Sequence, residues 1–476
     1  MTIEVDIAIL GGGPGGYTAA IRAAQLGKKV AIIEQDKVGG TCLHKGCIPS
    51  KALLRSAEVF HTVKDASSFG VMLPADAVSL RFDLVQGRKR QTVKQLYQGL
   101  QYLMKKHDIQ IISGKGRVIG PSIFSPRSGA VAVELADGEM ETVVSKNLII
   151  ATGSRPRSLP GLEPDGRYIL DSDQALELDG LPSSLIIIGG GVIGVEWASM
   201  MNDFGVQVTV VESASRLLPG EDGEIASELE KLFRKRGIRI LTGTELDLSS
   251  YHVDDNGQVA ISGKTSDGNV RLTSDQLLVS VGRQANAAEI GLENTDIQLT
   301  GGNIKVNAMM QTTEPHIYAI GDVNGGLQLA HAAAHEGIIA VEHAAGLKVL
   351  PLEHHRIPRC IYTRTEIASV GWTEHEARQH GYEVKIGKIP FQALGKAIVL
   401  GSVEGFVKVI ADNKTNDVLG VHMIGPHATD LITEAALAQL LEASAWEVGQ
   451  VIHPHPTLSE ALGEAMLAAQ GRAFVF

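Results

Sequence analysis

The chain has 476 residues, 44% of them hydrophobic and 20% charged, and a formal net charge of -11. This length predicts about three domains, and the composition is that of a folded globular protein rather than a disordered one. The excess of acidic residues disfavours nucleic acid or an anionic membrane as a partner, because both attract concentrated Lys and Arg.

Only three cysteines occur, which excludes a secreted disulfide framework. No apolar run approaches membrane-spanning length, and the first residues show neither a basic segment nor an apolar signal core. We therefore expect a soluble protein of a reducing compartment, in which a cysteine pair would be catalytic.

A strand predicted over residues 5–10 runs into a glycine-rich turn that satisfies G-x-G-x-x-G through Gly11, Gly13 and Gly16. A helix from about Tyr17 to Gly27 and a strand over 29–33 follow, and Glu34 stands at the end of that strand. Glycines allow a tight turn and close approach to a pyrophosphate at the helix N-terminus, and the acid can accept hydrogen bonds from a ribose. Together these features predict a dinucleotide site.

The stretch Gly39–Lys51 holds Cys42 and Cys47. The pair is either a redox disulfide or half of a metal site, and a structural zinc site would need a second pair, whereas Cys360 is isolated. We therefore favour redox use.

Residues five apart in a regular helix have Cα atoms about 8–9 Å apart, whereas a disulfide tolerates about 7 Å. If the two cysteines bond, the segment cannot be one uniform helix, and Gly46 would help it bend. Pro49 suits the first turn of a helix through residues 51–54, which would place Cys47 near a helix N-terminus, where thiolate is favoured.

Residues 56–106 show a mostly helical pattern with a polar break near 66–68. Residues 109–113 and 131–135 are predicted as strands of a small antiparallel excursion. A buried strand at 148–150 leads to a glycine turn, and Pro156 and Pro160 then suggest a linker.

The first pattern then repeats. A strand at 185–188 enters a second G-x-G-x-x-G, formed by Gly189, Gly191 and Gly194, and a helix through 197–204 and a strand at 206–211 lead to Glu212. Even the closing segment recurs, since residues 274–283 parallel residues 145–154. Two dinucleotide folds predict two nucleotides and electron transfer between them.

Glu212 favours NAD, because a carboxylate there would repel the extra phosphate of NADP, although Arg216 lies near enough to leave NADP open. A flavin can pass electrons to sulfur or to nicotinamide. Because the cysteines follow the first fold, we assign the flavin to that fold and NAD to the second.

Two further features lie before residue 351. Gly321 and Asp322 end a strand and could hold another part of the flavin. His331 and His335 share one helical face, but the coordinating acids of a metalloprotease motif are absent, so we expect no metal.

After Pro351 come strand patterns at 406–410 and 418–423 and helices at 428–444 and 459–470, whose alanine-rich faces suit either a core or a subunit interface. His453 and His455 stand between these helices. They are either metal ligands or include a general base oriented by Glu460, and a dithiol exchange requires such a base.

With these motifs, the chain resembles the pyridine nucleotide–disulfide oxidoreductases over essentially its whole length, and among them the members that act on dihydrolipoyl groups. Residues 208–212 and 217–222 add to this resemblance. The implied fold is α/β, with two Rossmann-like dinucleotide-binding domains, a central region and an α+β C-terminal interface domain. The implied boundaries are 1–150 for the FAD-binding domain, 151–281 for the NAD-binding domain, 282–350 for the central domain that completes the FAD site, and 351–476 for the interface domain of a homodimer.

The resemblance also implies residue roles. Cys42 would exchange with substrate, Cys47 would contact the flavin, and Lys51 and Glu196 would pair near the flavin ring. His455, oriented by Glu460, would be the base of the partner subunit's active site, with His453 a neighbour only. The implied FAD residues are Gly11, Gly13, Gly16, Glu34, Gly40, Thr41, Lys51, Thr152, Gly153, Gly321, Asp322 and Ala330; those for NAD are Gly189, Gly191, Gly194, Glu212 and Gly282.

The implied reaction is oxidation of a protein-bound dihydrolipoyl group with reduction of NAD+. The implied partners are the lipoyl domains of 2-oxoacid dehydrogenase complexes and the lipoyl carrier protein of glycine cleavage. The implied location is a bacterial-type cytoplasm, or an organelle matrix if the chain is a processed form.

The nearest alternative is a related reductase of another disulfide such as glutathione, against which Glu212 argues. Mercuric reductases and the larger thioredoxin reductases would need a C-terminal cysteine or selenocysteine pair, whereas this chain ends Ala-Phe-Val-Phe. A non-catalytic dinucleotide sensor would leave the cysteines and the His–Glu segment unexplained. Two departures from the family pattern are Leu43-His44-Lys45-Gly46 between the cysteines, where an asparagine is usual, and Thr365-Glu366, where many relatives have Pro-Glu.

Overall fold

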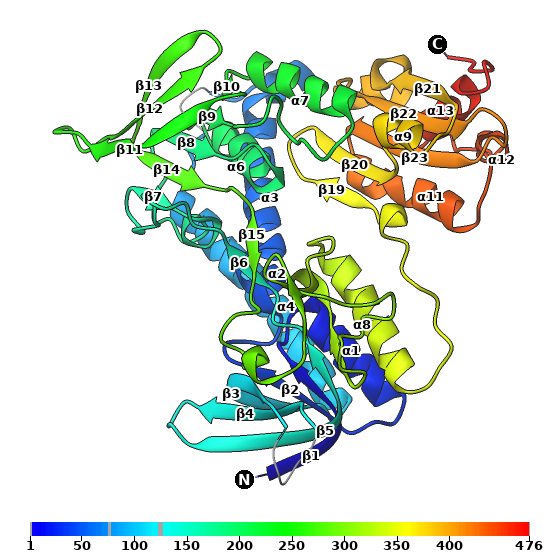
Figure 1. The fold of residues 1–476 in the computed structure, drawn as a ribbon. Coiled ribbons are helices and arrows are strands. Elements are labelled where there is room, and N and C mark those ends of the chain that lie inside the picture. The colour runs from blue at the N-terminus through cyan, green and yellow to red at the C-terminus, as the bar shows by residue number, and fades with distance from the viewer. Residues whose placement is uncertain (1, 75–77, 122–126, 476) are drawn as a thin grey trace. The chain divides into compact units, whose positions relative to one another are not determined.

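The computed structural model describes residues 2–74, 78–121 and 127–475, and these form two compact units, each with its own sheets (Figure 1). Unit 1 comprises residues 1–52, 83–157 and 283–352, and unit 2 comprises 53–82, 158–282 and 353–476. Each unit is assembled from three separate stretches of chain. The four consecutive domains expected from the sequence therefore stay a prediction.

Unit 1 is built on a six-stranded sheet. Its strands are β1 (Thr2–Leu10), β2 (Val30–Glu34), β3 (Gln110–Ile119), β4 (Ala130–Leu135), β5 (Met140–Ile150) and β18 (Ile317–Ala319), with the small pairs β6 (Ser154–Pro156) and β15 (Arg283–Ala285), and β16 (Leu299–Thr300) and β17 (Asn303–Ile304). Its helices are α1 (Pro14–Gln25), α2 (Gly40–Lys45), most of α4 (Phe82–Lys106), α8 (Ala330–Ala344), the start of α3 (Cys47–Lys64) and the 3-10 turns Leu292–Asn294 and Gly321–Asn324.

The centre of this sheet is parallel. Strand β1 pairs in parallel with β2 and β5, and Ile9 lies opposite both Ile32 and Ile149, all three fully buried. Such burial on both faces is typical of parallel strands and explains their continuous apolar runs. Strand β4 is antiparallel to β3 and β5, which confirms the predicted excursion. Helix α1 begins at Pro14, earlier than the predicted Tyr17, because proline suits the first turn of a helix.

Unit 2 contains three sheets. Their strands are β7 (Ile169–Leu170), β8 (Ser184–Ile188), β9 (Gln207–Val211), β10 (Arg239–Leu241) and β14 (Gln276–Val279); β11 (Glu245–Val253), β12 (Val259–Thr265) and β13 (Gly268–Ser274); and β19 (Arg359–Ile361), β20 (Glu366–Gly371), β21 (Val384–Pro390), β22 (Phe406–Asp412) and β23 (Val418–Gly425). Its helices are α5 (Ser172–Ala175), α6 (Val192–Asp203), α7 (Gly223–Lys235), α9 (Glu374–Gln379), α10 (Gly395–Leu400), α11 (Ala428–Leu440), α12 (Ala445–Gly449) and α13 (Glu460–Ala468), with 3-10 turns Ala66–Phe69, His354–Arg356 and Phe391–Ala393.

The internal repeat predicted from the sequence is confirmed. Strand β14 pairs in parallel with β8, just as β5 pairs in parallel with β1, so the two closing segments occupy equivalent places. Residues 154–156 form β6 and pair with β15, and the boundary between the two units falls between residues 157 and 158, inside the linker suggested by Pro156 and Pro160.

The C-terminal sheet, in the order β19-β20-β23-β22-β21, is antiparallel and packs against α11 and α13. Alanines of both helices, such as Ala435 and Ala465, are fully buried in its core. The alanine-rich faces are therefore core, whereas Leu440 and Trp446 remain exposed in the single chain.

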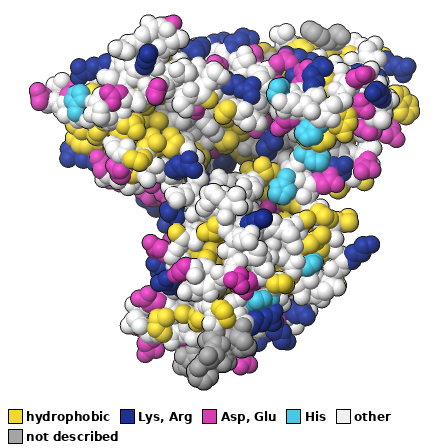
Figure 2. All heavy atoms as spheres, in the orientation of Figure 1, with side chains coloured by type: hydrophobic (Ala, Val, Ile, Leu, Met, Phe, Trp, Pro, Cys, Tyr) yellow, Lys and Arg dark blue, Asp and Glu magenta, His cyan; other side chains and the backbone are white. Residues whose placement is uncertain are grey.

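The surface mixes both signs of charge. Figure 2 shows acidic and basic side chains interspersed over the face in view. In the described parts of the chain, no helix combines the length and the apolar character needed to cross a membrane.

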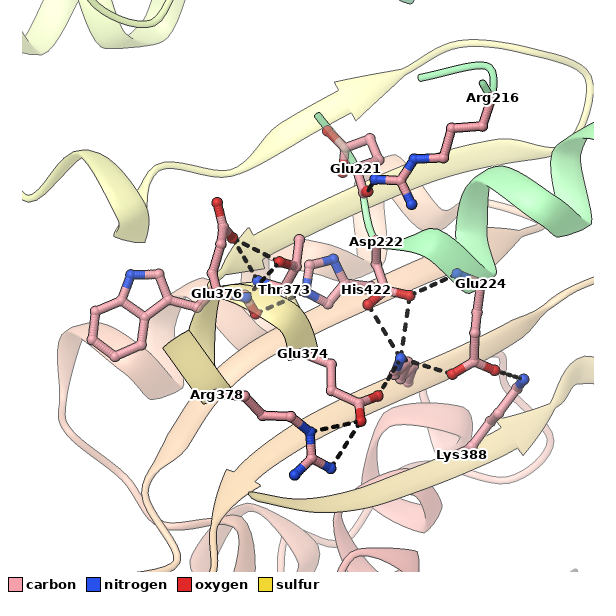
Figure 3. A network of polar contacts seen from close by, with 12 residues as sticks. Arg216, Glu221, Asp222, Glu224, Thr373, Glu374, Glu376, Arg378, Lys388 and His422 are labelled. Atoms are coloured by element: carbon pink, nitrogen blue, oxygen red, sulfur yellow. Dashed lines mark hydrogen bonds and ion pairs between the residues drawn. The ribbon is translucent and has the colours of Figure 1, made fainter. Parts of the chain in front are cut away.

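A buried ion cluster joins the segment before α7 to the C-terminal sheet within unit 2. The Lys408 ammonium, whose side chain is 2% exposed, lies 3.1 Å from Asp222, 2.7 Å from Glu224 and 2.9 Å from Glu374. Figure 3 shows the three carboxylates pointing toward one another from two parts of the chain. Since an unpaired buried charge is expensive, each side of this contact depends on the other.

We expect Lys408→Met to destabilise the protein by about 3 kcal/mol, because Asp222 would keep a buried charge without its partner. Lys388→Met is the matched control, since that more exposed lysine pairs with Glu224 and lies over the Phe406 ring, and it should cost under about 1 kcal/mol. Urea unfolding measures both. Equal losses for the two variants would contradict the importance of burial.

The cluster also predicts a pH dependence. The hydrogen bond from Lys408 lowers the pKa of Glu374, so the stability contributed by that carboxylate is present above its unfolded pKa and is lost as pH falls through the lowered folded value. The wild type should therefore lose more stability than Lys408→Met between pH 7 and pH 3. Parallel stability curves for the two proteins would disprove this.

Candidate active site

The first glycine turn joins β1 to α1 in unit 1. Gly11 has φ 107°, and a Cβ atom there would lie 2.3 Å from the Ala151 carbonyl oxygen; a Cβ atom at Gly16 would lie 2.0 Å from the carbonyl oxygen of Gly11. Only glycine fits at these two positions. The close approach brings the N-terminus of α1 against the end of β5.

The second turn, between β8 and α6 in unit 2, repeats this geometry. Gly189 has φ 106°, with its Cβ position 2.4 Å from the Ser280 carbonyl oxygen, and the Cβ position of Gly194 is 1.9 Å from the carbonyl oxygen of Gly189. Gly282, also assigned to this nucleotide, has φ 104°.

The helix N-termini behind both turns are open. The residues that precede α1 and α6, Gly13 and Gly191, give no side-chain cap, and a Cβ atom at either would meet nothing within 4 Å. The backbone N–H groups of the two first turns are thus left for a ligand, and the positive end of the helix dipole favours a phosphate there.

The acids at the ends of β2 and β9 are held alike. Glu34 accepts hydrogen bonds from the N–H groups of Gly12 at 2.7 Å and Asp36 at 2.9 Å. Glu212 accepts from Gly190 at 2.6 Å and Ala214 at 2.7 Å. Each acid lies beside its glycine turn, where a ribose bound there would reach it.

Arg216, which left NADP open in the sequence, donates to the carbonyl oxygens of Pro219 at 2.9 Å and Glu221 at 3.0 Å. Its guanidinium therefore stabilises the turn before α7. Because Arg216 was the main support for NADP and its guanidinium is engaged in this turn, the NADP alternative is weakened.

The helix that carries the two cysteines is interrupted between them, as a disulfide would require. Helix α2 ends at Lys45, Gly46 departs from helical geometry, and α3 begins at Cys47. Cys42 and Cys47 are both in the thiol form. A hydrogen bond between them, together with burial, raises the pKa of Cys42, while the charge of Lys51 opposes the shift. The two sulfur atoms are therefore in contact, with Lys51 in electrostatic reach.

Residues around the cysteines complete this part. Gly40 and Thr41 open α2, and a Cβ atom at Gly40 would lie 2.7 Å from the Cα atom of Gly13, so the cysteine helix sits against the first turn. Tyr17 was not foreseen from the sequence; burial and the two cysteines raise its pKa. His44, one of the departures, contacts the Val38 carbonyl oxygen at 3.0 Å through Nε2.

The second part of the predicted flavin site lies where β5 and β18 end. Thr152 and Gly153 are both hydrogen-bonded to Asn286. Asp322 accepts from Ser154, whose hydroxyl and carbonyl oxygens accept from Arg283 at 2.7 and 2.8 Å. Ser154 and Arg283 are the last residues of the two repeated closing segments, the only sequence signal that could have linked them.

The remaining predicted residue of this site, Ala330, is the first residue of α8. Helix α8 is also held to the turn before it: the buried Glu336 accepts from the Gly321 N–H at 2.6 Å and from Asn324 at 2.9 Å. Glu336 was not found from the sequence.

The residues of unit 1 fit a flavin dinucleotide. An uncapped helix N-terminus offers donors to a pyrophosphate, Glu34 lies at the ribose position, and the thiol pair adjoins the same turn. The corresponding helix and acid of unit 2 fit NAD.

Unit 2 also carries the predicted base. His455 Nδ1 lies 2.9 Å from Glu460 Oε1, and the His455 side chain is 77% exposed. Burial alone would raise the pKa of Glu460, but hydrogen bonds from the Thr457 N–H and from His455 outweigh it, so this pKa is lowered.

His453 is placed differently from His455. It is nearly buried, pairs with Glu434 at 2.8 Å and lies against Gly463. The hydrogen bond to Glu434 raises the pKa of His453. His453 therefore belongs to the packing of unit 2, and no group of three or more potential metal ligands exists among the described residues.

Two dinucleotide turns and a thiol pair beside the first of them define a class, the flavin- and nicotinamide-dependent disulfide oxidoreductases. Residues 5–337 match the family described as pyridine nucleotide-disulphide oxidoreductase, and residues 357–466 match its dimerisation domain. The chain belongs to this family.

Curated relatives are named dihydrolipoyl dehydrogenase. One from Bacillus subtilis is 58% identical over 100% of both chains, and one from Zymomonas mobilis is 44% identical over 100% of both. Among solved structures, LpdA from Mycobacterium tuberculosis aligns with a TM-score of 0.89 and 30% identity over 98% of this chain and 99% of that one. The predicted family and α/β fold class are thus confirmed.

Gly13→Ala tests the open helix N-terminus. Its backbone is extended and its Cβ position is free, so the protein without FAD should keep its melting temperature, while FAD affinity falls because the methyl group enters the phosphate site. Gly16→Ala is the matched control, in which the Cβ clash should lower the melting temperature itself. Thermal unfolding and flavin titration separate the two, and undiminished flavin affinity in Gly13→Ala would contradict the assignment.

Proposed function

We propose that this protein oxidises protein-bound dihydrolipoyl groups to lipoyl groups and reduces NAD+ to NADH, with FAD as the intermediate carrier. The observation that carries the proposal is the contact between Cys42 and Cys47 across the break at Gly46, beside the first dinucleotide turn. The relatives named dihydrolipoyl dehydrogenase support the choice of substrate.

The base acts first. Glu460 accepts a hydrogen bond from Nδ1–H of His455, which leaves Nε2 to take a proton from the incoming dihydrolipoyl thiol. The resulting thiolate attacks Cys42 of the oxidised pair and releases Cys47 as thiolate. The second substrate thiol then displaces Cys42 and leaves as the lipoyl disulfide. His455 comes from the partner subunit in this scheme.

The reduced pair then passes its electrons on. Cys47, at the N-terminus of α3, is the thiol favoured as thiolate, and it would face a bound flavin. FAD, when bound, supplies two-electron transfer from the thiolate pair to nicotinamide. Glu212 binds the NAD+ ribose, and the N-terminus of α6 binds its pyrophosphate.

The partners follow from this chemistry. The functional form is a homodimer formed through the dimerisation domain, and the substrates are the lipoyl domains of 2-oxoacid dehydrogenase complexes and the lipoyl carrier protein of glycine cleavage. The enzyme works in a bacterial cytoplasm. A reductase of another disulfide, such as glutathione, is the less favoured alternative because Glu212 and Arg216 are arranged for NAD.

The thiol pair is tested by anaerobic titration of the FAD-loaded protein with dihydrolipoamide and then NAD+. We expect a long-wavelength absorbance band to develop on reduction and NADH to form in stoichiometric amount. Cys42→Ser should abolish lipoamide turnover. Full activity in Cys42→Ser, or faster turnover with glutathione than with lipoamide, would refute the assignment.

The His455–Glu460 pair is tested by substitution. In Glu460→Gln the amide oxygen can still accept from Nδ1–H, so the imidazole keeps its orientation, but the negative charge beside it is lost. Reduction of the enzyme by dihydrolipoamide should therefore slow modestly, whereas His455→Gln should lower kcat by about 10²-fold or more. An unchanged rate of reduction in Glu460→Gln would show that the carboxylate does not act on this base.

A further inference from the structure

Three acceptors of helix α6 form a polar stripe: Glu196, Ser199 and Asp203. Their spacing of three and four residues puts them on one face of the helix. All three are buried, at 7%, 1% and 8% exposed. Buried acceptors need donors, and the partners of this stripe come from other elements of unit 2.

The principal partner is the 362–364 loop, which joins β19 to β20 of the C-terminal sheet. The Tyr362 N–H donates to Glu196 Oε1 at 2.9 Å, and the Arg364 N–H donates to Ser199 Oγ at 2.9 Å. The Arg364 guanidinium donates to Asp203 at 3.2 Å. One short loop therefore contacts every member of the stripe.

Both sides of this contact are anchored. Arg236, after α7, donates to Ser199 Oγ and the Ser199 carbonyl oxygen, both at 2.9 Å, and lies 2.9 Å from Asp203. On the loop side, Arg364 also contacts His61 of α3 at 2.6 Å. Beyond the loop, Glu366 accepts from the Thr429 N–H at 3.0 Å and the Thr429 hydroxyl at 2.7 Å. The loop is thus held on one side by helix α6 and on the other by its contacts with His61 and Thr429.

We propose that the 362–364 loop is a positioning element of the active site: the Tyr362 N–H sets the orientation of the Glu196 carboxylate, and Arg364 holds the loop in place to do so. The inference rests on the proposed function and on the catalytic role that the family resemblance implies for Glu196. It assigns a function to Tyr362 and Arg364 of the Tyr-Thr-Arg-Thr-Glu segment, which the catalytic scheme does not use.

The physical reason lies in the position of Glu196 on α6. The N-terminus of this helix binds the NAD+ pyrophosphate in the proposed function, so Glu196, on the next turn, belongs to the nicotinamide side. A hydrogen bond from an N–H to a carboxylate is stronger than a neutral one, and it fixes direction as well as distance. If the loop shifts, this carboxylate turns, and its field at the transferring electrons changes.

The test uses Arg364→Met in the FAD-loaded full-length protein. Loss of the guanidinium frees the loop, so hydrogen exchange in the peptide spanning residues 358–366 should become about tenfold faster. Oxidation of the reduced enzyme by NAD+ should slow about tenfold, while reduction by dihydrolipoamide keeps its rate. Arg378→Met is the matched control: it removes an exposed guanidinium that pairs with Glu374 of α9, leaves Glu374 its partner Lys408, and should change neither quantity.

Two further variants keep the test decisive. Asp203→Asn weakens the Arg364 anchor while leaving an acceptor for Arg236, and it should reproduce the faster exchange if Arg364→Met does not fold. If Arg364 acts through Glu196, adding Arg364→Met to Glu196→Gln should slow the NAD+ step no further than Glu196→Gln alone.

The outcomes separate the two proposals. Unchanged exchange in both Arg364→Met and Asp203→Asn would overturn the positioning role of the loop, whatever the activity. Faster hydrogen exchange in the loop, with an unchanged rate of oxidation by NAD+, would support the role of Arg364 in holding the loop against Glu196. It would overturn the placement of Glu196 on the nicotinamide side. If dihydrolipoamide failed to reduce the FAD-loaded wild-type protein, the proposed function would be refuted, while the exchange result would remain valid.

Discussion

The close approach of backbone to backbone at the two glycine turns is the constraint on which the rest of this structure depends. At Gly16 and Gly194 no side chain could stand between the helix and the preceding turn. That contact sets the first turn of each helix at the end of a parallel sheet, with its N–H groups uncapped. These two places therefore favour the binding of a phosphate.

The position of the cysteine segment depends on the first glycine turn. Gly40 packs on Gly13, so the short helix that carries Cys42 is located by the dinucleotide site itself. A continuous helix would hold the two sulfur atoms too far apart, and the interruption at Gly46 brings them into contact. Binding a nucleotide and presenting a thiol pair are therefore two results of one piece of backbone geometry.

Much of this could be predicted from the sequence because the determining residues are close together in the chain. The glycine motifs, the repeated strands and the break between the cysteines all depend on local spacing, and the structure confirms those elements. The Lys408 cluster, the Ser154–Arg283 contact and the 362–364 loop could not be found this way. The contacts Ser154–Arg283, Arg364–Ser199 and Lys408–Asp222 join residues that are 129, 165 and 186 positions apart. In the sequence, Lys, Arg and Glu also look like ordinary solvated surface residues.

Glu212 does two things at once. The carboxylate that we propose binds the NAD+ ribose also holds its own turn in place, because it accepts hydrogen bonds from the N–H groups of Gly190 and Ala214. A change of coenzyme preference from NAD to NADP would require replacement of Glu212. That replacement would also remove the two hydrogen bonds that hold the glycine turn. Because one side chain serves both coenzyme preference and the local structure of the turn, no single substitution of Glu212 would change the preference for NAD without also loosening the turn.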